Sequence, residues 1–182
     1  FDLAGAERGH PPGDHARALR MALDGGLALT LHAGESDAGE RVLEAVRLGA
    51  ARIGHGVRLA DLLGTPSWPA LSAELAAHGT HLEVCPTSNI HTGAAASLAT
   101  HPIRALWAAG VSLSVHSDNR LMSLVTPSSE VQAVVAQAGL GWVDLLRMQR
   151  LAAQASFLPA AARQQALQRI DGWGRQQGLA PG

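Results

Sequence analysis

The sequence predicts an α/β fold built on a parallel sheet. Short apolar segments of strand character alternate with segments of helical character, which is typical of βαβ units. Polar residues, several of them histidines, follow directly after the apolar segments. Apolar residues make up 47% of the 182-residue chain and charged residues 16%, the composition of a globular protein of about one domain.

The first half of the chain contains three predicted strands and two predicted helices. The helices show apolar residues spaced for one face, and both end at glycine. The strands are short and apolar. In order along the chain, these elements are a strand at 1–4, a helix at 12–24, a strand at 27–31, a helix at 40–48 and a strand at 52–54.

The second half continues the alternation. A Gly, Ala and Ser-rich segment interrupts it as a loop at 91–100. The expected elements are a helix at 68–78, a strand at 81–84, a loop at 85–89, a helix at 101–109, a strand at 111–115 and two or three helices from 128 to about 178.

The strand ends carry the main functional signal. The carboxyl ends of parallel strands lie on one side of a sheet, where α/β proteins place their sites. We therefore expect one polar cluster of residues that each follow a strand, comprising His32, Glu35, His55, Asn89 and Asp118.

Each member of this cluster also has a simpler interpretation. His32 is either a packed core residue or, with Glu35 three positions on, part of a site for metal and proton chemistry. His55 lies between Gly54 and Gly56, which indicates either a tight turn or a presented imidazole. Asp118 is either an oxygen ligand for a metal or the residue that forms an Asx turn.

The other histidines and the cysteine are assigned structural roles. Cys85 has no base nearby in the sequence, so we expect a buried structural thiol, with Ser88 and Asn89 as loop residues that line the site. His116 is left open. The remaining histidines are expected in solvated turns (His78, His81) or at the surface and in helix caps (His10, His15, His91, His101).

Charge and composition exclude several classes of protein. All fourteen basic residues are Arg against fifteen acidic residues, and a net charge of -1 argues against a surface for nucleic acid or anionic membranes. One Cys excludes an internal disulfide framework. No apolar run reaches the roughly 18 residues of a membrane span. The chain starts with Phe1 in a strand-like run, so we expect a preceding segment. Because the sequence shows no targeting segment, we expect a cytoplasmic location by default.

Together the motifs resemble the adenosine deaminase family. Five of them occur in that family's order, and each lies at a strand end. They are Phe-Asp-Leu-Ala-Gly at 1–5, His-Ala-Gly-Glu at 32–35, Gly-His-Gly-Val at 54–57, Cys-Pro-Thr-Ser-Asn at 85–89 and Ser-Asp-Asn at 117–119. The tail Ala-Ser-Phe-Leu-Pro at 155–159 also resembles the family's carboxyl-terminal helices.

The resemblance implies a partial (β/α)8 TIM barrel. Residues 1–182 would form its carboxyl-terminal half, from strand four to strand eight with the final helices, and the amino-terminal half would be absent. The implied activity is that of a hydrolase acting on cyclic amidines, which uses one Zn2+ to convert adenosine to inosine and ammonia.

The resemblance also implies a role for each matching residue. His32 and Asp118 would bind zinc, which lowers the pKa of a water molecule toward ~7. Glu35 would protonate the purine N1, and His55 would orient and deprotonate the attacking water. Gly5 would offer its backbone N–H to the purine N3, and Asn119 would contact N7.

Two departures from the family pattern matter. Asn119 stands where the family commonly has Asp, and an amide can donate to N7 without a proton being added first. The family's His-x-His at the end of strand one, which supplies two more zinc ligands, does not occur in this sequence. A catalytic zinc normally has at least three protein ligands, so we expect the chain alone to bind zinc weakly and to be inactive.

Three functions therefore stay open at this point. The first is deamination of a purine nucleoside, which would need the missing half-barrel for a complete site. The second is deamination of adenine or of a modified adenosine. The third is a half-barrel that binds a partner without catalysis. A half-barrel also has two open sheet edges, which predicts poor solubility or pairing of chains.

Overall fold

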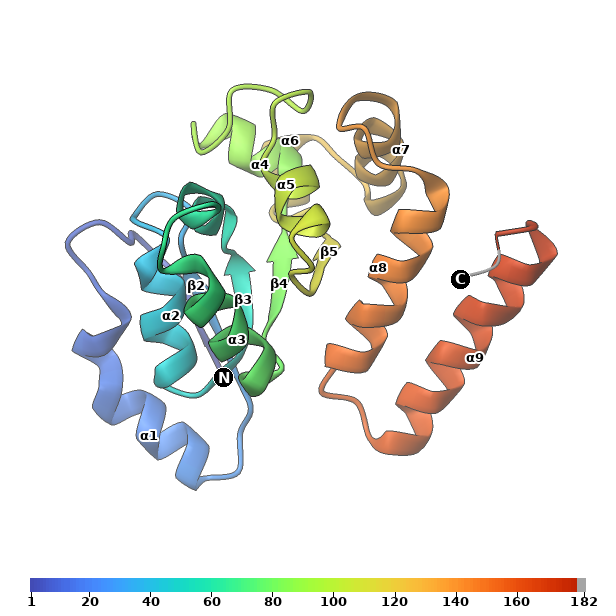
Figure 1. Ribbon diagram of the computed structural model, residues 1–182. Helices are drawn as coiled ribbons and strands as arrows, with labels where there is room; N and C mark the ends of the chain where they lie inside the picture. Colours follow the sequence, from blue (N-terminus) through green and yellow to red (C-terminus); the bar gives the residue numbers. More distant parts are fainter. Residues whose placement is uncertain (180–182) are drawn as a thin grey trace.

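The computed structural model describes residues 1–179 and shows one parallel sheet (Figure 1). The strands lie in the order of the sequence, β1-β2-β3-β4-β5, and every neighbouring pair is parallel. The predicted α/β alternation is thus confirmed. The strands are β1 (Asp2–Leu3), β2 (Leu29–Ala33), β3 (Ala50–His55), β4 (His81–Val84) and β5 (Leu113–Val115).

Helices connect the strands and complete the chain. None of them, within the part of the chain that the structure describes, is long and apolar enough to span a bilayer. The α-helices are α1 (Ala16–Asp24), α2 (Glu40–Arg47), α3 (Trp68–His78), α4 (Pro86–His91), α5 (Ile103–Ala108), α6 (Arg120–Ser123), α7 (Pro127–Gln137), α8 (Trp142–Ala155) and α9 (Ala160–Gln176). Two 3-10 helices add to these, η1 (Pro12–His15) and η2 (Val57–Leu62).

Most of the predicted boundaries fit to within two residues, but η2 and α6 have no counterpart in the prediction, and three further segments differ. The helix expected at 12–24 is divided into η1 and α1, and the strand expected at 27–31 instead runs from Leu29 to Ala33. The segment expected as a loop at 85–89 begins the short helix α4. Pro86 suits the first position of a helix, because its fixed φ and missing N–H cost nothing there. The last three residues of the 1–182 domain lie outside the described residues.

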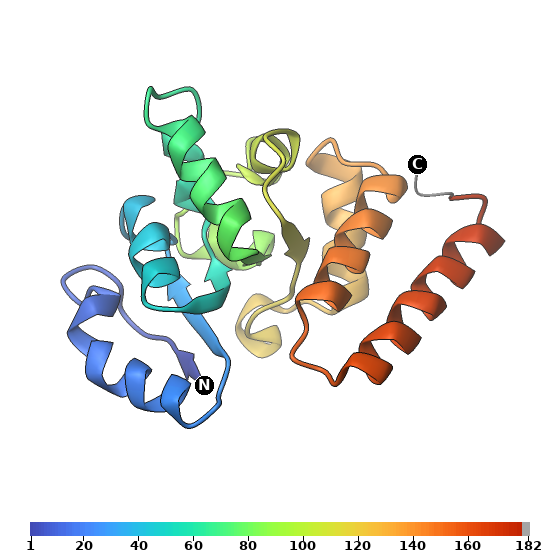
Figure 2. The same ribbon diagram turned by 60° about the horizontal axis from the view of Figure 1, so that its bottom comes forward.

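One face of the sheet is apolar and packs on helices. Helices α1 and α2 contact β2 and β3 on that side, and α8 contacts β5 (Figures 1 and 2). Side chains alternate along each strand, so the residues that face the helices are fully buried leucines and isoleucine: Leu29, Leu31, Ile53, Leu82 and Leu113. Their burial forms the main core.

The other face of the sheet is polar. The strand registers place its side chains in two rows, one across Asp2, Thr30, Arg52 and His81 and one across His32, Gly54, Glu83 and Ser114. The second row lies nearer the carboxyl ends of the strands. This row leads into the cluster that the sequence predicts.

Candidate active site

A cavity of about 310 Å³ lies where the carboxyl ends of β2, β3, β4 and β5 meet. Three of the predicted residues line it, His32, His55 and Asp118. The structure therefore brings together residues that are up to 86 positions apart in the chain. The rest of the lining consists of Gly54, Glu83, Cys85, His116 and Ser117.

His32 owes its position to the glycine beside it. Gly54 is its direct partner in the register between β2 and β3. A Cβ atom at position 54 would overlap the imidazole ring of His32. The ring fills this space and lies 5.1 Å from the ring of His55, measured between centroids. Gly54 is thus required for the packing of His32. The glycines on both sides of His55 in the sequence do not by themselves distinguish this role from that of a turn.

His55 ends β3 in an unusual backbone conformation. Its φ is 64° and that of Gly56 is 68°, so the chain turns through two consecutive left-handed residues. A non-glycine residue in this region is uncommon and often marks a functional site. The ring is buried, and burial lowers the pKa of His55, while the nearby Glu35 carboxylate opposes that shift.

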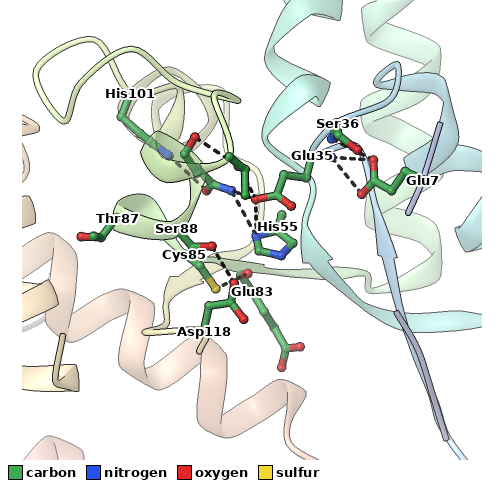
Figure 3. Close-up of polar contacts among 12 residues, drawn as sticks. Glu7, Glu35, Ser36, His55, Glu83, Cys85, Thr87, Ser88, His101 and Asp118 are labelled. Atoms are coloured by element: carbon green, nitrogen blue, oxygen red, sulfur yellow. Dashed lines mark hydrogen bonds and ion pairs between the residues drawn. The ribbon is translucent and has the colours of Figure 1, made fainter. Parts of the chain in front are cut away.

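Glu35 lies next to His55 and is held by hydrogen bonds (Figure 3). Its Oε1 is 3.4 Å from His55 Nδ1 and accepts hydrogen bonds from Asn89 Nδ2 at 2.7 Å and from Thr92 Oγ1 at 2.9 Å. The loop that carries Glu35 is fixed by Glu7. The Glu7 carboxylate accepts hydrogen bonds from the backbone N–H groups of three consecutive residues, at 2.9–3.1 Å, starting at Glu35.

Asp118 follows β5 and is positioned from α4. Its φ is 50°, and its Oδ2 accepts a hydrogen bond of 2.6 Å from Ser88 Oγ. Helix α4 is in turn fixed by Glu130 of α7, which is only 1% exposed. The Glu130 carboxylate accepts hydrogen bonds from the backbone N–H and the hydroxyl of Thr87, both at 2.6 Å. A buried carboxylate needs such partners to offset its desolvation.

Cys85 is a buried thiol, as predicted. Burial raises the pKa of its Sγ, and the neighbouring carboxylates add to that effect, so the thiol stays protonated. Its Sγ donates to the backbone carbonyl of Glu83 at 3.6 Å. Nothing in this environment activates it as a nucleophile.

His81 and His116 form a buried polar chain through Ser114. Ser114 Oγ lies 2.7 Å from the Nε2 atoms of both rings, and His81 Nδ1 lies 2.9 Å from Ser112 Oγ. The expectation that His81 is a solvated turn residue is wrong, because it begins β4 and faces the polar side of the sheet, 1% exposed. Burial lowers the pKa of His81 to about 4 and also lowers the pKa of His116.

His101 is a second exception. It was expected at the surface or in a helix cap, and the surface expectation is wrong, because the residue is 4% exposed. It stands one residue before Pro102, the N-cap residue of α5, and its Nδ1 caps the first turn from there by accepting a hydrogen bond from the backbone N–H of Ile103 at 3.1 Å. The other histidines that were assigned to solvated turns, the surface or helix caps are exposed as expected: His10, His15, His78 and His91.

Gly5 and Asn119 lie at the borders of the site. Gly5 lines a small pocket of about 50 Å³ that also includes Glu7 and His32. Asn119 is exposed and begins α6, where its Oδ1 accepts hydrogen bonds from the backbone N–H groups of Leu121 and Met122. Its Nδ2 group is not used in that cap.

The donor set for a metal is partial. Among residues 1–179, no group of three or more His, Cys, Asp or Glu side chains is placed to hold a metal ion. His32 and Asp118 line the same cavity and supply an imidazole and a carboxylate, both of which suit zinc. Their residue types fit part of a zinc site, which would need further ligands besides these two.

Comparisons with known proteins agree with this geometry. The family model described as adenosine deaminase matches residues 1–173. An adenosine deaminase of Mycobacterium tuberculosis (strain H37Rv) is 41% identical over 165 residues, which are 87% of this chain and 45% of the relative. The chain thus spans less than half the length of the relatives that it matches.

Solved structures show the same fold. An adenine deaminase from Arthrobacter aurescens has a TM-score of 0.86 and 27% identity, and the match covers 96% of this chain and 52% of that one. The apo N6-methyl-AMP deaminase from Arabidopsis thaliana has a TM-score of 0.79 and 25% identity, covering 96% and 50%. An amidohydrolase from Burkholderia ambifaria with bound Zn has a TM-score of 0.82, covers 97% and 50%, and shows the fold alone at 21% identity. The expected partial (β/α)8 barrel is confirmed.

Proposed function

Because the chain belongs to the adenosine deaminase family, we propose that it is the carboxyl-terminal half of a zinc-dependent deaminase barrel. The complete barrel converts adenosine and water to inosine and ammonia. In this reaction a C6–O bond forms, the C6–N bond breaks, and the leaving amine takes up the proton that makes it ammonia.

One observation carries the proposal. His32, His55 and Asp118, from three strand ends, line a single cavity, and Glu35 lies beside it within 3.4 Å of His55. These are the residue types that a metal-assisted hydrolysis needs, namely ligands, an acid and a group that orients water.

His32 and Asp118 would hold the zinc ion together with ligands from the amino-terminal half. When bound, zinc acts as a Lewis acid that lowers the pKa of water so that a nucleophile is available at neutral pH. Ser88 Oγ already donates to Asp118 Oδ2, which leaves the other carboxylate oxygen for the metal. Such supporting hydrogen bonds orient the ligands of metal sites.

Glu35 would supply the proton to the purine N1. Its Oε1 already accepts two hydrogen bonds, from Asn89 and Thr92, so its Oε2 is the oxygen that can carry a proton toward the substrate. His55, whose Nδ1 contacts both Glu35 and Asn89, would orient the attacking water.

Two residues at the borders of the site would hold the purine. Gly5 would donate its N–H to N3, and Asn119 would donate to N7. The cap of α6 occupies the Oδ1 atom of Asn119 and so leaves the Nδ2 group free to donate.

The test uses what we call the completed barrel. It consists of this chain fused to the part of the M. tuberculosis relative that lies outside the matched 45% of its length. We expect the zinc-loaded completed barrel to release ammonia from adenosine, and both Glu35→Gln and Asp118→Asn to abolish the release. The chain by itself should bind zinc weakly and release none.

A matched control uses the relative's own carboxyl-terminal part in the same fusion. Inactivity of the completed barrel beside an active control would overturn the proposal and would favour a half-barrel that binds without catalysis. Ammonia release by the chain alone would overturn the proposed need for a second half.

A second candidate function is supported by the solved structures. Their names include an adenine deaminase and an N6-methyl-AMP deaminase, at 27% and 25% identity. The same assay with adenine and with N6-methyl-AMP separates these substrates from adenosine. The proposal names adenosine because the 41%-identical relative is an adenosine deaminase.

A further inference from the structure

We propose that His101 is a positioning residue that sets the hydrogen-bonding state of both Glu35 and His55 through the side-chain amide of Asn89. This inference rests on the proposed function. His101 does not line the cavity, so it acts through another residue and does not touch the substrate.

The first step is the tautomer of His101. The backbone N–H of Ile103 can only donate, and it points to His101 Nδ1 at 3.1 Å. A neutral His101 therefore carries its proton on Nε2. Burial lowers the pKa of His101 to about 4, so the ring is neutral at pH 7.

The second step is the orientation of the Asn89 amide. His101 Nε2 lies 3.3 Å from Asn89 Oδ1 and, as the protonated nitrogen, donates to it. Asn89 is 0% exposed, so its amide is shielded from bulk solvent. With Oδ1 held by His101, the two N–H bonds of Nδ2 point to the opposite side.

The third step is what those N–H bonds reach. One meets Glu35 Oε1 at 2.7 Å, and the other meets His55 Nδ1 at 3.1 Å. Since His55 Nδ1 accepts a hydrogen bond, the neutral His55 ring carries its proton on Nε2. In this state His55 can orient the attacking water by donating to it, and the expected removal of the water's proton by His55 is not part of the proposal. Glu35 Oε1 is likewise committed as an acceptor, which leaves Oε2 for proton transfer. A flipped amide would instead place an oxygen against the Glu35 carboxylate.

This chain of contacts gives a reason for a buried histidine at the start of α5. Acceptance of the Ile103 N–H alone does not need an imidazole, because any short side chain with an acceptor atom, such as Asn or Asp, can do the same. Only a side chain with an acceptor near its backbone and a donor at its far end can bond both Ile103 N–H and Asn89 Oδ1. A neutral histidine with the proton on Nε2 meets that requirement.

Two substitutions separate the two contacts of His101. In His101→Asn, the short amide can take the place of Nδ1 and keep the cap of α5, but it does not reach Asn89. In His101→Gln, the longer amide can take the place of Nε2 and donate to Asn89, but it gives up the cap. A role in folding alone predicts that kcat falls together with the melting temperature in both variants. The positioning role predicts that kcat depends on whether the contact with Asn89 is kept, whatever the melting temperatures are.

In the zinc-loaded completed barrel, we expect His101→Asn to lower kcat for adenosine by about 10- to 100-fold, as loss of supporting hydrogen bonds at metal sites does. KM should change little. The melting temperature should fall in both variants, because each leaves a buried polar group without its partner. His101→Gln should keep kcat within about threefold of the wild type, although its melting temperature falls. A wild-type kcat in His101→Asn, or losses of kcat that follow the melting temperatures, would overturn the proposal.

A second readout does not depend on turnover. Nitrogen-15 NMR of the histidine rings in the completed barrel should show the Nε2–H tautomer for both His101 and His55. The His55 signals should move toward a mixture of tautomers in His101→Asn and stay in place in His101→Gln. If the completed barrel is inactive, the proposed function fails, and these signals still decide the positioning role. An Nδ1–H tautomer at His101, or His55 signals unmoved in His101→Asn, would disprove it.

Discussion

Gly54→Ala is the substitution that tests the packing of the site most directly. Position 54 lies in β3 beside His32 of β2, in the row of polar side chains that leads into the cavity. The added methyl group would occupy space that the His32 ring fills. The ring must then rotate out of the cavity, because the two backbones are fixed in the sheet.

The magnitude follows from two opposing effects. Replacing glycine by alanine in a strand stabilises a protein by about 0.5–1 kcal/mol when the site is open. Overpacking of a filled site costs about 1–3 kcal/mol. We therefore expect Gly54→Ala to lower the free energy of unfolding by up to about 2.5 kcal/mol. With His32 displaced, zinc affinity should fall to the level of His32→Ala.

The assay is urea unfolding of the completed barrel, together with zinc binding measured by competition with a chromophoric chelator. The matched control is Gly172→Ala in α9, where the nearest atom to an added Cβ is Arg175 Nη2 at 4.0 Å. That variant should be stabilised by about 0.5–1 kcal/mol and should keep its zinc affinity. Zinc affinity preserved in Gly54→Ala would refute the conclusion that this glycine holds His32 in place.

Two further predictions follow from the polar contacts. The substitution Ser88→Ala leaves Asp118 Oδ2 without its donor at 2.6 Å. The zinc affinity of the completed barrel should then fall by about 10- to 100-fold. An unchanged zinc affinity would contradict the supporting role of Ser88. The pKa of His81 in the folded chain is about 4, below its ordinary value of 6.5. Protonation of this side chain therefore favours the unfolded chain. The free energy of unfolding should fall as the pH falls from 6.5 toward 4, by about 2 kcal/mol at pH 5. Urea unfolding at pH 7 and pH 5 should show this loss in the wild type and a smaller one in His81→Gln; an equal loss in both would assign the pH dependence to other groups.

The sequence was sufficient to predict the sheet and the place of the site. The apolar strand segments are short and regularly separated by helices, so a parallel sheet could be predicted from the alternation alone, whereas the strand order could not. Because side chains at the carboxyl ends of parallel strands converge, His32, His55 and Asp118 could be grouped before their distances were known. The roles assigned to them by resemblance stay predictions until the completed barrel is assayed.

The supporting residues could not be found in this way. Glu130 reaches Thr87 across 43 positions, and Glu7 reaches the loop of Glu35 across 28. Nothing near either glutamate in the sequence marks it as a buried acceptor. The burial of His81 did have a signal in the sequence. His81 alternates with Leu82 in β4, so it lies on the polar face of that strand, opposite the apolar face of Leu82.

The polar face of the sheet links the fold to the proposed function. Parallel sheets normally have both faces covered. Helices α1 and α2 pack on the apolar side of β2 and β3, and on the polar face His81 and Ser114 are buried as well. On the polar face, Arg52 bonds Thr30 and pairs with Glu83, and its guanidinium lies 3.8 Å from the centre of the Phe157 ring. Phe157 comes from the turn between α8 and α9, so that turn covers the end of the polar face that is opposite the cavity. A second wall of strands facing these polar rows would enclose a barrel that is closed at one end and open at the end with His32 and Asp118. That enclosure would also provide the positions from which the remaining zinc ligands can reach the cavity.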